Sequence, residues 1–181
     1  KNFILGYPRN DKMLSPSISK NRIINLIFGD KRKFSKLIIF MPTHRSSRTY
    51  KRNLPIEMIL NTTKEGLSEL DNYLNSKDYL MIIKPHPHEK YIKELGLQNI
   101  TLLNSKFLQE NQLDLYEIIG LSDILITDYS SVYYDYLLLN RPVVFFVFDN
   151  LFSQKPETFM FESYDFWMKG PKTYNLKGLI K

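Results

Sequence analysis

Short apolar runs alternate with helix-like stretches along most of this sequence. Each run is almost continuous in apolar residues, which is typical of a strand covered on both faces of a sheet. The runs that predict strands are Leu37–Met41, Tyr79–Ile83, Ile100–Leu103, Ile124–Thr127 and Pro142–Phe148, and those that predict helices are Lys64–Leu74, Glu89–Leu95, Leu113–Leu121 and Val132–Leu139. This alternation predicts an α/β fold with a Rossmann-like, doubly wound parallel sheet.

The length and composition suit a single domain of this kind. The chain has 181 residues, of which 43% are hydrophobic and 24% charged, as in an average soluble domain. It contains no cysteine, which excludes disulfides, thiolate metal ligands and cysteine nucleophiles. We interpret residues 1–181 as one domain with an irregular tail after about Leu151. Because the sequence begins at Lys1 and not at a methionine, we expect it to be part of a longer chain.

The charge of the chain favours anionic partners. Lys and Arg number 25 against 19 Asp and Glu, a net charge of +6, which suits a nucleotide, a phosphopolymer or an anionic membrane surface. We expect no nucleic acid as partner, because no helix-turn-helix, RNP or zinc-finger pattern is present. The apolar runs are far shorter than the about 20 residues of a membrane-spanning helix, and no signal peptide is visible. The sequence therefore predicts a cytoplasmic protein with at most peripheral contact at the inner face of the membrane.

The loop Thr127–Ser131 joins an expected strand to an expected helix. In a doubly wound sheet, ligands bind at the carboxyl ends of the strands, where such loops lie. Ser130 or Ser131 would cap the helix, and the free N–H groups at a helix start can bind phosphate. The alternative is that both serines are caps and bind nothing.

A second strand end carries Lys84-Pro85-His86-Pro87. The two prolines restrict the backbone on either side of His86. An imidazole held in this way can donate a hydrogen bond to a diphosphate or transfer a proton near neutral pH. The alternative is a surface turn in which His86 has no chemical role.

The loop after the first expected strand contributes Arg45. Arginine suits bidentate contact with phosphate, and Arg45 lies nearest the strand end. The three histidines of the chain, His44, His86 and His88, all lie in these loops. Zinc requires a fixed tetrahedral ligand set, and no spacing typical of one is present. We therefore expect no metal site.

Taken together, these segments resemble the CDP-glycerol glycerophosphotransferases of teichoic-acid-type polymer synthesis. The most specific match is Ser122–Val132, followed by Asp135 and Asn140–Pro142. Weaker matches in the same order along the chain are Gly6–Asp11, Pro42–Arg45, Lys84–Pro87 and Gly170–Pro171.

The resemblance implies a two-domain GT-B fold, of which this chain is the C-terminal, nucleotide-binding half without the N-terminal acceptor domain. It also implies a reaction. A hydroxyl of a polyol-phosphate or polysaccharide acceptor attacks the β-phosphorus of CDP-glycerol, and CMP is released. The product would be a cell-surface or capsular polymer, and no cofactor is expected besides the donor substrate.

The resemblance further assigns roles to residues. His86 would contact the diphosphate and assist departure of the leaving group. Arg45, Ser130 and Ser131 would hold the phosphates, while Asp128 would order its loop or meet the glycerol. Thr43 and Lys84 fall in the matching loops as further substrate-binding residues. The other essential histidine of the family lies in the N-terminal half, so the chain alone should bind nucleotide without turnover.

Two departures from the family pattern leave the transferred unit open between glycerol, ribitol and another group. His44 replaces the usual aromatic residue, and no Arg-Gly-aromatic segment is evident in residues 152–161. Two other functions also stay open. One is a GT-B glycosyltransferase for capsule synthesis that uses a CMP- or UDP-sugar, since His-Pro and Ser-Ser motifs also occur in capsule sialyltransferases. The other is a basic module that binds phosphopolymer without catalysis.

Overall fold

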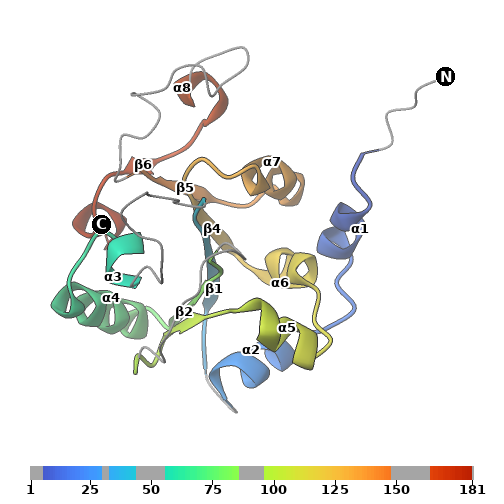
Figure 1. Ribbon diagram of the computed structural model, residues 1–181, viewed down its shortest axis with the longest axis horizontal. Coiled ribbons are helices and arrows are strands. Elements are labelled where there is room, and N and C mark those ends of the chain that lie inside the picture. Colours follow the sequence, from blue (N-terminus) through green and yellow to red (C-terminus); the bar gives the residue numbers. More distant parts are fainter. Residues whose placement is uncertain (1–5, 30–32, 44–55, 86–95, 148–163, 181) are drawn as a thin grey trace.

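The computed structural model describes residues 6–29, 33–43, 56–85, 96–147 and 164–180 (Figure 1). These residues form a parallel sheet with the strand order β3-β2-β1-β4-β5-β6. Its strands are β1 (Lys36–Met41), β2 (Tyr79–Ile83), β3 (Ile100–Leu102), β4 (Ile124–Thr127), β5 (Val143–Phe146) and β6 (Lys172–Thr173). The chain builds the sheet outward from β1 to β3 and then returns to place β4 on the other side of β1. This order confirms the predicted Rossmann-like, doubly wound sheet.

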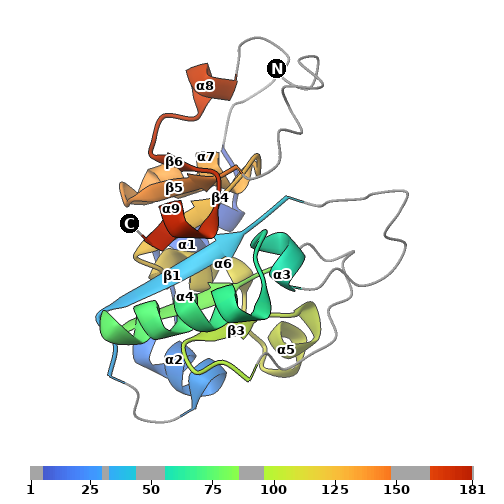
Figure 2. The same cartoon turned by 90° about the vertical axis from the view of Figure 1, so that its left-hand side faces the viewer.

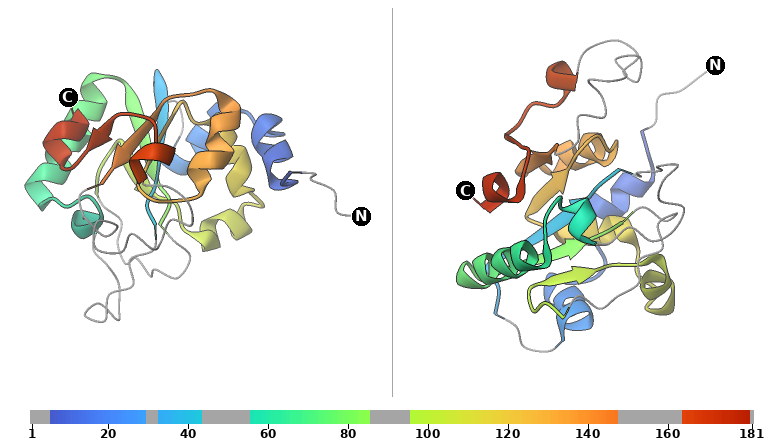
Figure 3. Two further views of the ribbon diagram at one scale, coloured as in Figure 1. Left: turned by 90° about the horizontal axis from the view of Figure 1, so that it is seen from above. Right: turned by 60° about the vertical axis from the view of Figure 1, so that its left-hand side comes forward.

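Helices cover both faces of the sheet (Figures 1 and 2). One face carries α1 (Arg9–Leu14), α2 (Lys20–Phe28), α5 (Ser105–Glu110), α6 (Leu115–Leu121) and α7 (Val132–Tyr136), the last followed by a 3₁₀ turn, Leu137–Leu139. The other face carries α3 (Ile56–Ile59), α4 (Lys64–Ser76) and α9 (Leu176–Ile180). The short helix α8 (Tyr164–Trp167) lies beyond one end of the sheet, near β6 (Figure 3). None of the helices in the described ranges combines the length and apolar character that crossing a bilayer requires.

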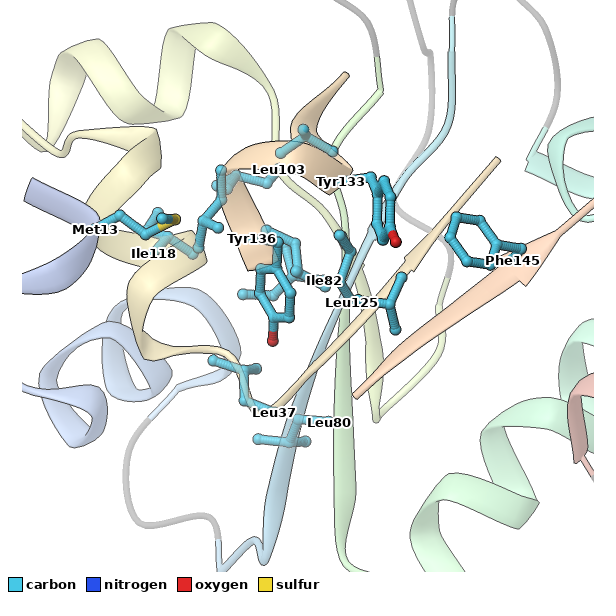
Figure 4. Packing of buried hydrophobic residues seen from close by; sticks show 14 of the residues in the cluster. Met13, Leu37, Leu80, Ile82, Leu103, Ile118, Leu125, Tyr133, Tyr136 and Phe145 are labelled. Carbon is cyan, nitrogen blue, oxygen red and sulfur yellow. The ribbon is translucent and has the colours of Figure 1, made fainter. Parts of the chain in front are cut away.

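The central strands are buried on both faces. Along β1, Leu37 and Ile39 join the core on the α6 side, whereas Ile38 and Phe40 join the core on the α4 side. Figure 4 shows the first of these cores, to which Leu37 of β1 and Tyr136 of α7 both belong. Burial on both faces explains why the strands are continuous apolar runs and not alternating ones.

Most helices begin where a side chain caps them. Asp114 accepts a hydrogen bond from Tyr116 N at 2.8 Å at the start of α6, and Thr63 accepts one from Gly66 N at 3.2 Å at the start of α4. Such contacts satisfy N–H groups that the first helical turn leaves free.

The segment Asn140–Pro142, part of the match to the family, has a structural role. Asn140 adopts a left-handed conformation with φ 50° and ends the 3₁₀ turn, a conformation that asparagine tolerates better than most residues. Arg141 then donates from Nη1 to the carbonyl oxygens of Gly120 and Ser122 at the end of α6. A cation at this point also suits the negative end of the helix dipole.

The tail is more regular than expected. Residues 164–180 contain α8, β6 and α9, and β6 extends the sheet beside β5. The interpretation of an irregular tail is therefore wrong for these residues. The helices α1 and α2 were also not predicted, and the helix expected at Glu89–Leu95 lies outside the described residues.

Candidate nucleotide-binding site

The candidate site lies where the strand order reverses, between the carboxyl ends of β1 and β4. In open α/β sheets the two neighbouring loops at this point diverge and leave a crevice for a ligand. Here these loops begin with Pro42-Thr43 after β1 and Asp128–Ser131 after β4, and Lys84 follows the neighbouring strand β2. The topology thus brings three predicted segments to one edge of the sheet.

Asp128 ties the two central loops together. Its side chain is fully buried, and it accepts hydrogen bonds from Thr43 N at 2.8 Å, Thr43 Oγ1 at 3.0 Å and Tyr129 N at 2.6 Å. Just before it, Thr127 Oγ1 donates to Met41 O at 2.8 Å. Of the two roles that the resemblance implied for Asp128, the geometry matches the ordering of its loop.

A tyrosine from the C-terminal segment, Tyr164, contacts the loop after β4. Tyr164, the first residue of α8, donates from its hydroxyl to Asp128 O at 3.1 Å, and its ring meets that of Tyr129 edge-to-face at 5.0 Å. Burial raises the pKa of Tyr164 above its usual value, so the phenol remains a donor at neutral pH. Sequence reasoning missed Tyr164, because its partner lies 36 residues away in an element of different type.

Ser131 is the most accessible of the predicted site residues that the structure describes: it is exposed, whereas Ser130 and Thr43 are half-buried. The expectation that Ser131 caps α7 through its side chain is wrong. Ser131 stands at the N-cap position, but its backbone is already helical, with φ −63° and ψ −14°, and its side chain makes no capping hydrogen bond. A capping side chain needs an extended backbone to reach the N–H groups of the first turn. Among the described residues, Ser130 makes no side-chain capping bond to α7 either.

Thr43 and Lys84 are held by the protein. Thr43 bonds to Asp128 as described above, and Lys84 is only 5% exposed. Lys84 Nζ donates to Pro85 O at 2.8 Å, while its backbone N–H donates to Phe40 O at 2.9 Å and so continues the pairing of β2 with β1. A buried ammonium at the carboxyl ends of these strands adds positive charge where an anionic ligand would lie.

Two of the main predicted residues, His86 and Arg45, lie outside the described residues, as do His44 and His88. In the part of the chain that the structure describes, no group of three or more His, Cys, Asp or Glu side chains could hold a metal ion. Because every histidine falls outside this part, the absence of a metal site stays a prediction.

A parallel sheet whose strand order reverses between β1 and β4 defines a Rossmann-like, doubly wound domain. The chain belongs to the CDP-Glycerol:Poly(glycerophosphate) glycerophosphotransferase family, whose sequence pattern matches residues 1–181.

Similar proteins of known activity come from teichoic acid synthesis. A teichoic acid poly(glycerol phosphate) polymerase of Bacillus spizizenii is 35% identical over 154 residues, covering 80% of this chain and 34% of the relative. A teichoic acid poly(ribitol-phosphate) polymerase of the same species is 31% identical over 143 residues, covering 77% of this chain and 21% of the relative. A Staphylococcus aureus teichoic acid glycerol-phosphate transferase is 29% identical over 152 residues, covering 80% and 34%. The chain thus spans about a third or less of these relatives.

A solved structure agrees with the fold. A histidine-to-asparagine variant of the wall teichoic acid polymerase TagF, soaked with CDPG, aligns with a TM-score of 0.71 at 26% sequence identity. The alignment covers 98% of this chain and 41% of that chain.

Proposed function

We propose that this chain is the nucleotide-binding domain of a transferase that moves glycerol phosphate, or a related alditol phosphate, from a CDP-alditol to a hydroxyl of a cell-surface or capsular polymer. Family membership over the whole sequence supports this class of reaction. The observation that carries the proposal is the position of Asp128–Ser131. These residues belong to the most specific family match, Ser122–Val132, and follow β4 at the switch point of the sheet, where nucleotides bind in such folds.

The proposed chemistry is a phosphoryl transfer. The acceptor hydroxyl attacks the β-phosphorus of the donor and gives its proton to a base. The bond from the β-phosphorus to the bridging oxygen breaks, and CMP leaves with that oxygen. Negative charge grows on the leaving group, so the site needs cations and hydrogen-bond donors at the diphosphate. In the proposal His86 and Arg45 supply them together with Ser130 and Ser131, and buried Lys84 adds charge nearby.

The base is proposed to lie in a second, N-terminal domain of a GT-B arrangement. This chain covers 41% of the TagF chain to which it is similar, which leaves room for such a domain in a full-length protein. We therefore expect the 181-residue chain to bind CDP and CMP but not to turn over.

Calorimetric titration of the chain with CDP tests the proposal. We expect saturable binding of one CDP, which His86→Ala and Ser130→Ala each weaken about tenfold through loss of a charge-assisted contact. Ser68→Ala is a matched control, because Ser68 is exposed on α4 and bonds to Lys64 O within its own helix. Absence of any CDP or CMP binding to the unsubstituted chain would overturn the proposal.

The transferred unit requires the full-length protein. Assays with CDP-glycerol, CDP-ribitol and CMP- or UDP-sugars would separate an alditol phosphotransferase from a glycosyltransferase. Transfer from a nucleotide sugar alone would contradict the proposal, since the family match and the teichoic acid relatives favour a CDP-alditol.

We also propose contact with an anionic membrane surface from the cytoplasmic side. Four apolar side chains are 40–54% exposed: Tyr134 on α7, Leu138 in the 3₁₀ turn after it, and Phe166 and Trp167 on α8. The rings of Tyr134 and Trp167 lie 6.5 Å apart. Lys169 Nζ lies 5.5 Å from the Phe166 ring. Exposed aromatic and aliphatic side chains beside a lysine suit the boundary between lipid headgroups and acyl chains.

Trp167 is the single tryptophan of the chain and reports directly on this patch. We expect its fluorescence to shift to shorter wavelength with phosphatidylglycerol vesicles and not with phosphatidylcholine vesicles. Phe166→Ser should weaken the binding, while Leu14→Ser, at an exposed position on α1, should not. An unchanged spectrum with anionic vesicles would refute membrane contact at this patch.

A further inference from the structure

A buried carboxylate on α7 joins three segments that are distant in the sequence. Asp135 is only 4% exposed. Its Oδ2 accepts hydrogen bonds from Arg9 Nε at 3.2 Å, Arg9 Nη2 at 2.9 Å and the Tyr116 hydroxyl at 2.8 Å, while its Oδ1 accepts one from Asn10 Nδ2 at 3.2 Å. We call this group of four residues the Asp135 network. It connects α1, α6 and α7, which lie side by side in Figure 1.

The partners of Asp135 are themselves held in place. The guanidinium of Arg9 lies 4.3 Å from the centre of the Tyr7 ring and 5.3 Å from that of Tyr116, close enough for cation–π attraction. Burial, together with the hydrogen bond to Asp135, raises the pKa of Tyr116 to about 12. The Tyr116 phenol therefore stays protonated and remains a donor across the physiological range.

The network lies one helical turn from the candidate site. Asp135 follows Ser131 by four residues. Between them, Tyr133 N donates to Ser130 O at 3.2 Å and Tyr134 N donates to Ser131 O at 3.1 Å. The loop and the first turn of α7 are therefore one hydrogen-bonded unit, and a movement of Asp135 displaces Ser130 and Ser131 with it.

Apolar packing and hydrogen bonds both hold α7 against the rest of the domain. Val132, Tyr133 and Tyr136 bury α7 against the sheet, and the Tyr136 hydroxyl donates to Ser122 O at 3.2 Å at the C-terminal end of the helix. Apolar burial itself is non-directional. Charge-assisted hydrogen bonds with a forked guanidinium have defined geometry. The Asp135 network thus adds directional contacts that can set the rotation and height of α7, in addition to the hydrogen bond of Tyr136.

We propose that Arg9 and Asn10 are positioning residues of the nucleotide site, which hold Asp135 and thereby place the Ser130–Ser131 loop for the diphosphate. The inference rests on the proposed function, since it assumes that this loop contacts the nucleotide. Arg9 and Asn10 themselves act through Asp135 and need no contact with the ligand.

The chain offers a matched control for this idea. Lys12, also on α1, forms an ion pair with Asp114 at 2.6 Å. This pair ties α1 to the start of α6 and does not involve α7. Loss of the Lys12 ion pair removes a contact between α1 and α6 only, whereas loss of the Arg9 ion pair removes contacts between α1 and α7.

The test compares Arg9→Gln with Lys12→Gln in the 181-residue chain, using CDP as the probe. We expect Arg9→Gln to raise the calorimetric Kd for CDP about tenfold and to speed amide hydrogen exchange at Tyr133 and Tyr134. Lys12→Gln should leave both within twofold of the unsubstituted chain. Arg9→Lys keeps the charge and one donor, so it should recover part of the affinity.

Each outcome bears on a different statement. Equal CDP affinity in Arg9→Gln and the unsubstituted chain would overturn the inference and leave the proposed function standing. An equal loss in Lys12→Gln would also overturn it, because docking of α1 would then be the cause. Absence of CDP binding to the unsubstituted chain would overturn both. If Arg9→Gln fails to fold, Tyr116→Phe removes one hydrogen bond from the same carboxylate and should raise the Kd about threefold; an unchanged Kd there would count against the inference.

Discussion

At each end of β4 an aspartate side chain accepts a hydrogen bond from a backbone N–H at the corresponding end of β1. Before the strand, Asp123 Oδ2 accepts a hydrogen bond from Leu37 N at 2.7 Å, at the start of β1. After the strand, Asp128 Oδ1 accepts one from Thr43 N at 2.8 Å, just beyond the end of β1. Each aspartate thus fastens β4 to β1, and both belong to the segment Ser122–Val132 that most resembles the family.

The surroundings of the two carboxylates differ. Asp123 is partly exposed and pairs with Lys20 Nζ at 2.5 Å, at the edge of the sheet opposite the candidate site. Asp128 is fully buried, and it orders the two loops that meet at the switch point. Within one family motif, Asp123 at the start therefore stabilises the sheet, whereas Asp128 near the end orders the loops of the candidate site. Resemblance to a family motif does not by itself make each of its residues functional.

The largest expected effect comes from Asp128→Asn. The amide keeps one acceptor oxygen but places an NH₂ group against the donors Thr43 and Tyr129. We expect the free energy of unfolding to fall by about 3 kcal/mol and CDP affinity to fall more than tenfold. Urea denaturation and calorimetry measure the two quantities. Unchanged CDP affinity would contradict the claim that Asp128, unlike Asp123, orders the nucleotide site.

Asp123→Asn makes the same chemical change at the other end of the strand. Because Asp123 is partly exposed and lies away from the crevice, we expect a loss of about 1–2 kcal/mol in the free energy of unfolding with no change in the Kd for CDP. The same two measurements apply, so the pair of variants forms a controlled comparison. Loss of CDP binding in a folded Asp123→Asn chain would contradict the account.

Thr43→Val probes the Asp128 end without removing a charge. The substitution keeps the shape of the side chain and deletes the hydrogen bond from Thr43 Oγ1 to Asp128. We expect a loss of about 1 kcal/mol in stability and a few-fold weaker CDP binding. Unchanged CDP affinity would show that nucleotide binding does not depend on the hydrogen bond from Thr43 Oγ1 to Asp128.

The smallest effect concerns alkaline pH. The pKa of Tyr164 is raised by burial, so the folded chain retains a proton that the unfolded chain loses above about pH 10. The stabilisation is present below that pH and is lost as pH rises. Between pH 9 and 11, unfolding free energies should fall more steeply for the unsubstituted chain than for Tyr164→Phe. Equal slopes would show that Tyr164 is not buried against Asp128.

Much of the scaffold could be predicted because burial on both faces of the sheet leaves a plain signal. The strand Ile124–Thr127 matches β4 residue for residue, and Tyr79–Ile83 matches β2. By contrast β6 is a two-residue strand, too short for any periodicity to show. The helix α1 buries only Met13, so its pattern is equally weak.

The site was harder to predict, because its geometry depends on contacts between distant segments. The predicted order of elements correctly indicated that Thr43, Lys84 and Asp128 follow the carboxyl ends of neighbouring strands. The sequence could not show that Ser131 is already helical, since that conformation follows from the folded loop. Nor could it show the Asp135 network, which joins residues more than a hundred positions apart.

The central claim is that nucleotide binds at the carboxyl edge of β1 and β4. Amide chemical-shift mapping of the isotope-labelled chain during CDP titration tests it most directly. We predict the largest shifts at Thr43, Lys84 and Asp128–Val132, with little change at Leu37 and Asp123. Shifts confined to Leu37 and Asp123, or saturable binding without shifts at Asp128–Val132, would contradict it.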